Sequence, residues 1–141
     1  MSGGAPSIEQ QLINHEGLRQ HPYRCTAGKL SIGVGRNLDD VGITAEEAYF
    51  LLFNDIAGCK KDLQDIFPAW ATFSIGRQWA LIDLRFNLGP VRFRGFNRMI
   101  AAIRTGDWSR AAAELKESLW WTQVQDARKL TLGRQLLTGE K

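Results

Sequence analysis

The sequence lacks the features that mark several classes of protein. It has two cysteines, too few for a disulfide framework, and no long run of Lys or Arg. No apolar run approaches the roughly 18 residues that span a bilayer, and residues 1–6 have neither the charged nor the apolar region of a secretory signal. We therefore expect synthesis in a cytoplasm, no stable membrane insertion, and cysteines that remain free thiols.

What the sequence does contain is typical of a folded globular chain. Hydrophobic residues make up 44% and charged residues 23% of the 141 positions, and that length suits one ordinary domain. The net charge of +3 and the pI of about 9.1 favour approach to a polyanion. They do not choose among nucleic acid, an anionic membrane and a cell-wall polymer.

The N-terminal segment predicts a helix over residues 7–16. Ser7 can cap its first turn, and Gly17 can end it. Glu16 lies on the same helical face as the apolar residues Ile8 and Leu12, where another apolar residue would be expected. A carboxylate therefore stands at the end of this helix.

The segment 21–34 changes to a period of two, which predicts a hairpin with its turn at Gly28. Leu30 and Ile32 would face one way and Ser31 the other, on a face of small residues with room for a ligand. Residues 37–42 are predicted to form a further extended segment that is rich in turns. We expect a small sheet of two or three strands.

The rest of the chain has helical periodicity. Thr44 and Glu47 form a capping box at the start of a helix of some 20 residues, which ends before Pro68. Helices of this length commonly join two lobes. Short helices follow, with caps at Ser74 and Asp107, and with weaker segments from about 120 to 137. Most Trp and Phe side chains here should be core, and one of Trp120 and Trp121 could line a cleft.

Three reactive side chains are closely spaced around the hairpin. Glu16 is followed after eight residues by Cys25, and Cys25 after five residues by Ser31. Hairpin geometry can bring them to one side of a cleft. Cys59, among apolar neighbours, is instead expected to be buried.

Two other kinds of site could be built from these residues, but the sequence supports them less well. A cysteine peptidase would pair Cys25 with His15 or His21, but the sequence has no downstream His to act as the base. A zinc site from His15, His21, Cys25 and Cys59 lacks the usual spacing of ligand pairs. We therefore expect no metal and no other cofactor, and only the basic bias supports a nucleic-acid partner.

The motif resembles the active-site signature of the phage-type lysozymes, the glycoside hydrolase family of the T-even phage lysozyme. That family has Glu, eight residues, Asp or Cys, five residues, Thr. The likeness continues through residues 42–48, 80–89 and 95–112, and to the closing Thr138-Gly139, so it covers almost the whole chain.

The resemblance implies an α+β, mainly helical, lysozyme-like fold. A small sheet-bearing lobe, about 17–50, would be joined by a helix, about 44–66, to a helical lobe, about 68–141, which also takes the helix 7–16. The whole chain would be a single domain, with the saccharide cleft between the lobes.

The implied activity is that of a muramidase, an endolysin that cleaves the β-1,4 bond between N-acetylmuramic acid and N-acetylglucosamine in peptidoglycan. Glu16 would be the general acid, a role that partial burial would favour, and Arg128 would orient it by an ion pair. Cys25 replaces the Asp of many members, and Ser31 replaces Thr. Together they would place water or stabilise the transition state, although Cys25 could also attack the anomeric carbon.

Saccharide-binding positions follow from the same resemblance. They are Phe86, Asn87, Asn37, Met99 and Glu114, of which Asn37, Met99 and Glu114 differ in type from what the family leads us to expect. The partner would be peptidoglycan glycan strands, bound by a monomer that depends on a holin or on cell lysis to reach the wall in the periplasm. A catalytically weak relative that binds peptidoglycan or a protein is the alternative.

Overall fold

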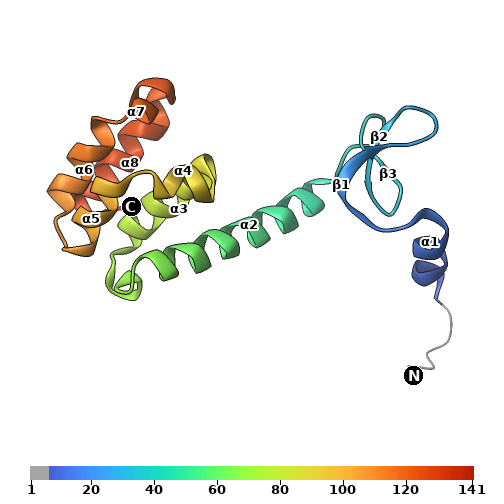
Figure 1. Cartoon of the computed structure of the whole chain (residues 1–141), viewed down its shortest axis with the longest axis horizontal. Helices are drawn as coiled ribbons and strands as arrows, with labels where there is room; N and C mark the ends of the chain where they lie inside the picture. Colours follow the sequence, from blue (N-terminus) through green and yellow to red (C-terminus); the bar gives the residue numbers. More distant parts are fainter. Residues whose placement is uncertain (1–6) are drawn as a thin grey trace. The chain divides into compact units, whose positions relative to one another are not determined.

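The structure is a computed structural model that describes residues 7–141 (Figure 1). The prediction about a secretory signal therefore lies outside the described residues. Contacts divide the chain into two compact units, Met1–Phe50 and Leu51–Lys141. The first contains helix α1 and the sheet, the second contains helices α3 to α8, and helix α2 (Ala45–Ile66) has residues in both. The predicted α+β, mainly helical class is confirmed.

The first unit is a small antiparallel sheet preceded by one helix. Helix α1 (Ile8–Glu16) begins as predicted at Ser7, whose Oγ accepts a hydrogen bond from the N–H of Gln10 at 3.1 Å. The strands lie in the order β1, β2, β3, and each pairs antiparallel with the next. Their bounds are Arg19–Arg24 for β1, Leu30–Gly33 for β2 and Arg36–Asn37 for β3.

Strand β2 is shorter than the alternating pattern predicts. It ends at Gly33, and Val34 and Gly35 form a turn. The reason is local, because Gly33 and Gly35 have φ values of 69° and 70°, which extended strands do not use. Within β2 the most buried residue is Ser31, at 3% exposure, while its apolar neighbours are only partly buried.

Helix α2 begins with the predicted capping box. The Thr44 N–H donates to Glu47 Oε1 at 3.0 Å, and the Glu47 N–H donates to Thr44 Oγ1 at 3.1 Å. Arg36 Nη1 also lies 2.8 Å from Glu47 Oε1, so Arg36 is a structural ion-pair partner of this cap. Arg36, and then Thr44, lower the pKa of the Glu47 carboxyl to about 2. This contribution to stability is present above the ordinary pKa of Glu and is lost as the pH falls toward 2.

The second unit is a bundle of short helices. Helix α3 packs on α8, α8 on α6, and α6 on α5. Ser74 and Asp107 cap α3 and α6 as predicted, and Ser118 caps α7. The helix bounds are Ile75–Leu88, Pro90–Arg94, Asn97–Arg104, Trp108–Lys116, Leu119–Gln123 and Asp126–Thr138 for α3 to α8.

Two short elements were not predicted. One is α4, which starts with Pro90 directly after the end of α3, and the other is the 3-10 turn Trp70–Thr72. Both are short: α4 has five residues and starts with Pro90, and the 3-10 turn has three and begins two residues after Pro68. Proline fits the first turn of a helix, but this preference alone does not distinguish a helix start from a loop.

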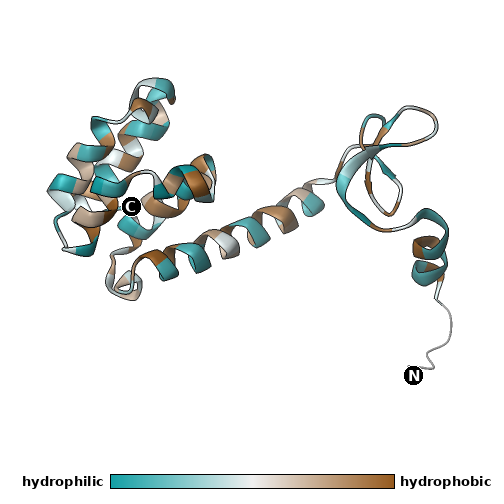
Figure 2. Ribbon diagram, viewed as in Figure 1, coloured by the Kyte–Doolittle hydropathy of each residue, from teal (hydrophilic) through white to brown (hydrophobic). Residues whose placement is uncertain are grey.

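Apolar and polar residues alternate around the turns of α2, and only its C-terminal half is buried in the second unit (Figure 2). There Cys59, Leu63 and Ile66 are at most 6% exposed, which confirms the buried position of Cys59. Burial raises the pKa of its thiol. The largest fully buried side chains of the core are Phe67, Phe93, Leu63, Leu81, Leu84, Met99, Ile103, Leu115, Leu132 and Leu136. Among residues 7–141, no helix has both the length and the hydrophobicity to cross a membrane.

One ion-pair cluster joins three helices of the second unit. Asp62 of α2 accepts hydrogen bonds from Arg85 Nε of α3 at 2.7 Å and from Arg94 of α4. Arg94 first, and then Arg85, lower the pKa of the Asp62 carboxyl. The Asp62 and Arg85 side chains are 16% and 14% exposed, so this pair is largely shielded from solvent, whereas Arg94 is 47% exposed. The shared carboxylate links α2, α3 and α4.

The packing of α3 against the C-terminal residues can be tested with two glycines. A Cβ on Gly76 would collide with the backbone carbonyl of Glu140, whereas a Cβ on Gly58 of α2 meets nothing within 4 Å. We expect Gly76→Ala to cost about 1–3 kcal/mol of the free energy of unfolding. Gly58→Ala should add about 0.5–1 kcal/mol, since alanine favours the helix.

The measurement is urea denaturation followed by tryptophan fluorescence. All 5 Trp residues lie in the second unit, so the signal reports on it directly. Equal midpoints for the two variants would contradict the packing described.

Candidate active site

Glu16 is the last residue of α1. Gly17 follows with φ 78°, and its N–H donates to the carbonyl of Ile13 at 2.8 Å, which ends the helix there. The Glu16 side chain is exposed, and no residue of α1 is buried. The side chain therefore lacks the partial burial that would favour the role of a general acid.

The Glu16 carboxylate lies against the turn between β2 and β3. A Cβ built on Gly35 would stand 3.0 Å from Glu16 Oε2. Gly35 also has φ 70°, a value that residues with side chains rarely adopt. A glycine at this position therefore allows the carboxylate to approach the backbone closely, consistent with the room expected on the small-residue face.

A tight turn connects β1 to β2 and carries Cys25. The Cys25 N–H donates to the carbonyl of Lys29 at 2.9 Å, and the Gly28 N–H donates to the carbonyl of Cys25 at 2.8 Å. Gly28 has φ 79°, which confirms the turn predicted there. In the strand register Arg24 lies opposite Leu30 and Tyr23 opposite Ser31, so Cys25 lies one residue toward the turn from the first pair and Ser31 one residue away from the turn.

The turn brings Cys25 and Ser31 together. Several groups lower the pKa of the Cys25 thiol: the backbone amide of Lys29 first, then that of Ala27, and also the Ser31 hydroxyl. Ser31 is buried, and its Oγ donates to the carbonyl of Lys29 at 3.3 Å. Cys25 is partly exposed. The thiolate form is thus stabilised at a position that solvent can reach.

Asn37, predicted to bind saccharide, is engaged within its own loop. Its Nδ2 donates to Asp40 Oδ2 at 2.9 Å, and its Oδ1 accepts from the Asp40 N–H at 3.0 Å. Both ends of the amide are therefore used to shape the turn after β3. A role in substrate binding stays a prediction.

The second unit contains a pocket of about 570 Å³ that includes two of the predicted binding residues, Met99 and Glu114. Met99 is only 1% exposed and belongs to the core, so it offers a wall rather than a polar contact. Trp120 also borders this pocket, as expected for one of the tryptophan pair. The remaining lining residues are Arg92, Gly95, Phe96, Asn97, Arg98, Glu117, Ser118 and Leu119.

Trp120 also contacts Asn87, another of the predicted saccharide-binding residues. Its Nε1 donates to Asn87 Oδ1 at 2.8 Å, which fixes the orientation of the amide. Asn87 is exposed, and within the described residues no hydrogen bond occupies its Nδ2. The amide can therefore donate outward to a ligand.

Phe86 and Arg128 lie at a second pocket, of about 370 Å³. Phe86 is 44% exposed. Arg128 Nε lies 2.9 Å from Asp83 Oδ1, an ion pair without a well-aligned hydrogen bond, since this shielded oxygen accepts none. The prediction that Arg128 orients Glu16 stays a prediction.

The residues that the sequence analysis did not single out lie mainly at the pocket of about 570 Å³. Arg92 and Arg98 border it from α4 and α5, and nothing in their local pattern distinguishes them from other surface arginines. Phe96 borders it as well, although its helical spacing indicated core. Within residues 7–141, no group of three or more His, Cys, Asp or Glu side chains is arranged to hold a metal ion.

Comparison with known proteins agrees with this architecture. The phage lysozyme family model matches residues 13–135, and the chain belongs to that family. The chain is 31% identical to an endolysin of Acyrthosiphon pisum secondary endosymbiont phage 1, over 83% of this chain and 78% of that protein. It is 29% identical to the pre-baseplate central spike protein Gp5 of Enterobacteria phage T4, over 94% of this chain. The chain spans 28% of the length of that spike protein.

The contact between Ser31 and the thiol predicts how Cys25 reacts. In a Cys59→Ala background, Ser31→Ala should move the pH profile of Cys25 alkylation by iodoacetamide to higher pH. The hydroxyl lowers the pKa of the thiol, so its loss leaves less thiolate at neutral pH. Thr26→Ala is the matched control, because Thr26 is exposed in the same turn. Superimposable profiles for the Ser31 variant and its parent would refute the contact.

Proposed function

We propose that the protein is a muramidase that hydrolyses the β-1,4 bond between N-acetylmuramic acid and N-acetylglucosamine of peptidoglycan. The observation that carries the proposal is that the Cys25 N–H and the Ser31 hydroxyl both donate to the carbonyl of Lys29, in the same unit as Glu16, in a member of the phage lysozyme family. An acid and a second group that handles water are what glycosidic hydrolysis needs.

Glu16 is the proposed general acid. It gives its proton to the glycosidic oxygen as the bond to the anomeric carbon breaks. Its exposed position at the end of α1 leaves the carboxyl accessible to a glycan. Gly35 supports this role, because it lets the carboxylate rest against the β2–β3 turn without steric conflict.

Cys25 and Ser31 are the proposed second group. The thiolate takes a proton from a water molecule, and the oxygen of that water bonds to the anomeric carbon, which gives inversion. We favour water over direct attack by sulfur because the Ser31 hydroxyl beside Cys25 supplies a polar partner that can hold the water.

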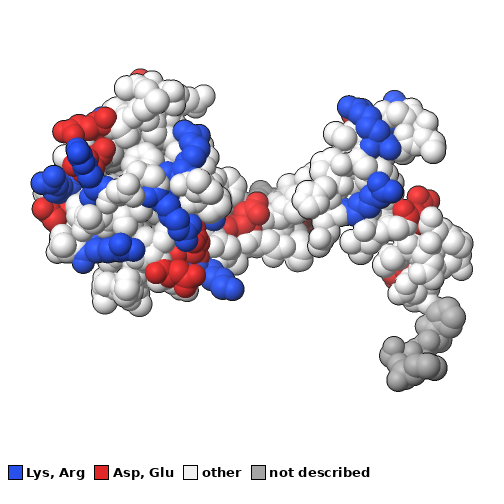
Figure 3. All heavy atoms as spheres, in the orientation of Figure 1, with Lys and Arg blue, Asp and Glu red and all other residues white. Residues whose placement is uncertain are grey.

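Further residues proposed to contact the glycan lie in the second, helical unit. Asn87, oriented by Trp120, can donate to a sugar oxygen, and Glu114 adds an acceptor at the neighbouring pocket. Lys and Arg side chains are spread over the visible face of this unit (Figure 3), which suits a wall polymer that carries carboxylates. Action as a monomer on the wall, after release that depends on a holin, belongs to the same proposal.

A second candidate is a catalytically weak module that binds peptidoglycan or a protein partner. The observation in its favour is Cys25 itself, because a thiol is a poorer base than the carboxylate found in many family members. This candidate predicts binding to the wall without dependence on Glu16.

The test is the release of new reducing ends from purified peptidoglycan at neutral pH under reducing conditions. Glu16→Gln should lower the rate by a factor of at least about 100, because the general acid is lost. Glu9→Gln is the matched control, as Glu9 is an exposed carboxylate in the first turn of the same helix. The absence of reducing ends with the unaltered protein would overturn the muramidase and leave the binding module.

A further inference from the structure

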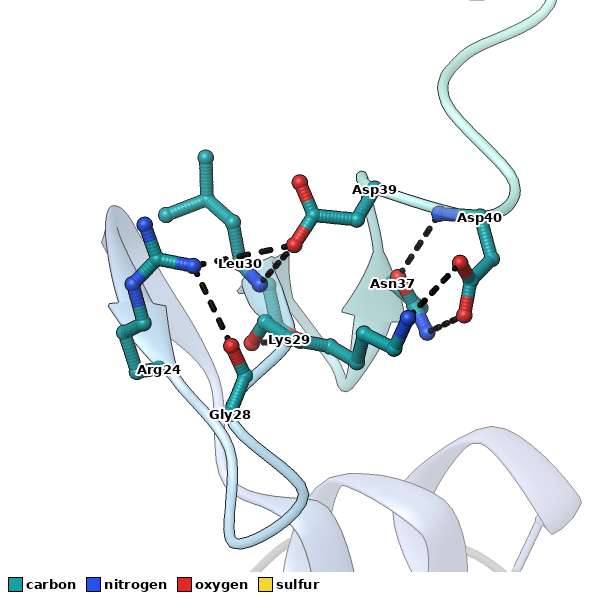
Figure 4. Close-up of polar contacts among 8 residues, drawn as sticks. Arg24, Gly28, Lys29, Leu30, Asn37, Asp39 and Asp40 are labelled. Carbon is teal, nitrogen blue, oxygen red and sulfur yellow. Dashed lines mark hydrogen bonds and ion pairs between the residues drawn. The ribbon is translucent and has the colours of Figure 1, made fainter.

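A network of charged and polar side chains lies around the turn between β1 and β2 that carries Cys25 (Figure 4). It joins the end of β1, the turn itself and the loop after β3. Of its side chains, the family resemblance implies a role for Asn37 alone, in saccharide binding. Its members are Arg24, Lys29, Asn37, Asp39 and Asp40.

Asp39 makes the contact closest to the reactive pair. Its Oδ2 accepts a hydrogen bond from the Leu30 N–H at 2.8 Å. That N–H belongs to the peptide group whose carbonyl, from Lys29, accepts from the Cys25 N–H at 2.9 Å and from Ser31 Oγ at 3.3 Å. One planar peptide group is therefore held by Asp39 at its N–H and by the two reactive residues at its oxygen.

Arg24 reinforces the same arrangement from the preceding strand. Its Nη1 donates to the carbonyl of Gly28 at 3.1 Å and lies 3.7 Å from Asp39 Oδ2. Arg24 directly precedes Cys25, so Asp39 is linked to both arms of the turn. The Arg24 side chain is 67% exposed, and this ion pair alone would contribute little. The backbone hydrogen bond to Leu30 is the stronger constraint.

We propose that Asp39 is a positioning residue that fixes the Lys29–Leu30 peptide group and thereby sets the mutual geometry of Cys25 and Ser31. The N–H of Lys29, in the preceding peptide group of the same turn, is the group that most lowers the pKa of the thiol, so the reactivity of Cys25 depends on the turn that Asp39 holds. The assignment deepens the proposed hydrolase function, and its catalytic part rests on that function.

Asp40 provides an internal control. It follows Asp39 directly, has a similar exposure and also forms an ion pair, with Lys29 Nζ at 3.1 Å. Its side-chain oxygens bond only to other side chains, those of Lys29 and Asn37. Loss of Asp40 removes a charge from the same loop without freeing the Leu30 N–H.

The negative charge of Asp39 and its hold on the peptide group predict opposite effects on the alkylation rate of the Cys25 thiol. The charged groups around the turn are Arg24 and Lys29 in the hairpin, with Asp39 and Asp40 in the loop. If Asp39 acted only by its negative charge, removing it would favour the thiolate and speed alkylation at neutral pH. If Asp39 acts by holding the peptide group, removing it loosens the donors to sulfur and slows alkylation.

The experiment measures the pH profile of Cys25 alkylation in the Cys59→Ala background. Asp39→Ala should lower the rate at pH 7 by on the order of threefold and move the profile to higher pH. Asp39→Asn, whose amide oxygen can still accept from the Leu30 N–H, should restore most of the rate. Asp40→Ala should leave the profile unchanged. Thermal unfolding of each variant identifies any that fails to fold.

Three outcomes would overturn the proposal: faster alkylation in Asp39→Ala, equal effects of Asp39→Ala and Asp40→Ala, or no rescue by asparagine. If Asp39→Ala does not fold, the Asp39→Asn and Asp40→Ala profiles decide, because a charge effect would speed alkylation in the asparagine variant. In the reducing-end assay, Asp39→Ala should lower kcat with little change in KM. The alkylation profile does not require hydrolysis, so it tests this assignment even if the muramidase proposal fails.

Discussion

The hydrogen bond from the Cys25 N–H to the carbonyl of Lys29 closes the turn on which the site depends. It holds Cys25 beside the start of β2, which carries the buried Ser31 hydroxyl, and backbone amides of the turn lower the pKa of the thiol. Without this closure Cys25 would be an ordinary exposed cysteine. The sheet, in turn, gives the turn its register, since Arg24 and Leu30 pair directly beneath it. The chemistry of the first unit is thus built mainly from backbone geometry.

The sequence predicts most of the elements because their start signals are local. Ser7, Thr44 and Ser74 each contact a residue three positions on, so the caps can be read without knowing the fold. The helix α4 was not predicted because it is only five residues long and starts with Pro90. The extent of β2 was overestimated because alternation does not reveal that Gly35 has a positive φ.

The residues of the candidate site likewise fall into those that the sequence predicts and those that it does not. Cys25 and Ser31 are close in sequence, so their spacing and a hairpin suffice to predict that both lie at or next to the start of β2, where they contact the carbonyl of Lys29. That Glu16 converges with them stays a prediction. The pocket beside Trp120 depends on the packing of α4 to α7, and no short motif encodes it. The contact made by Asp39 was not predicted either, because its hydrogen bond to Leu30 spans nine positions and depends on how the loop after β3 folds back.

The central claim is that Cys25 supplies the second functional group of a hydrolase. The most direct measurement is the rate of reducing-end release by Cys25→Ala and Cys25→Asp, compared with the unaltered protein. A carboxylate can act on water as the thiolate does, so the account predicts that aspartate retains activity within about tenfold while alanine loses a factor of about 100 or more. An alanine variant as active as the unaltered protein would contradict it and make Cys25 merely a small side chain that the site tolerates.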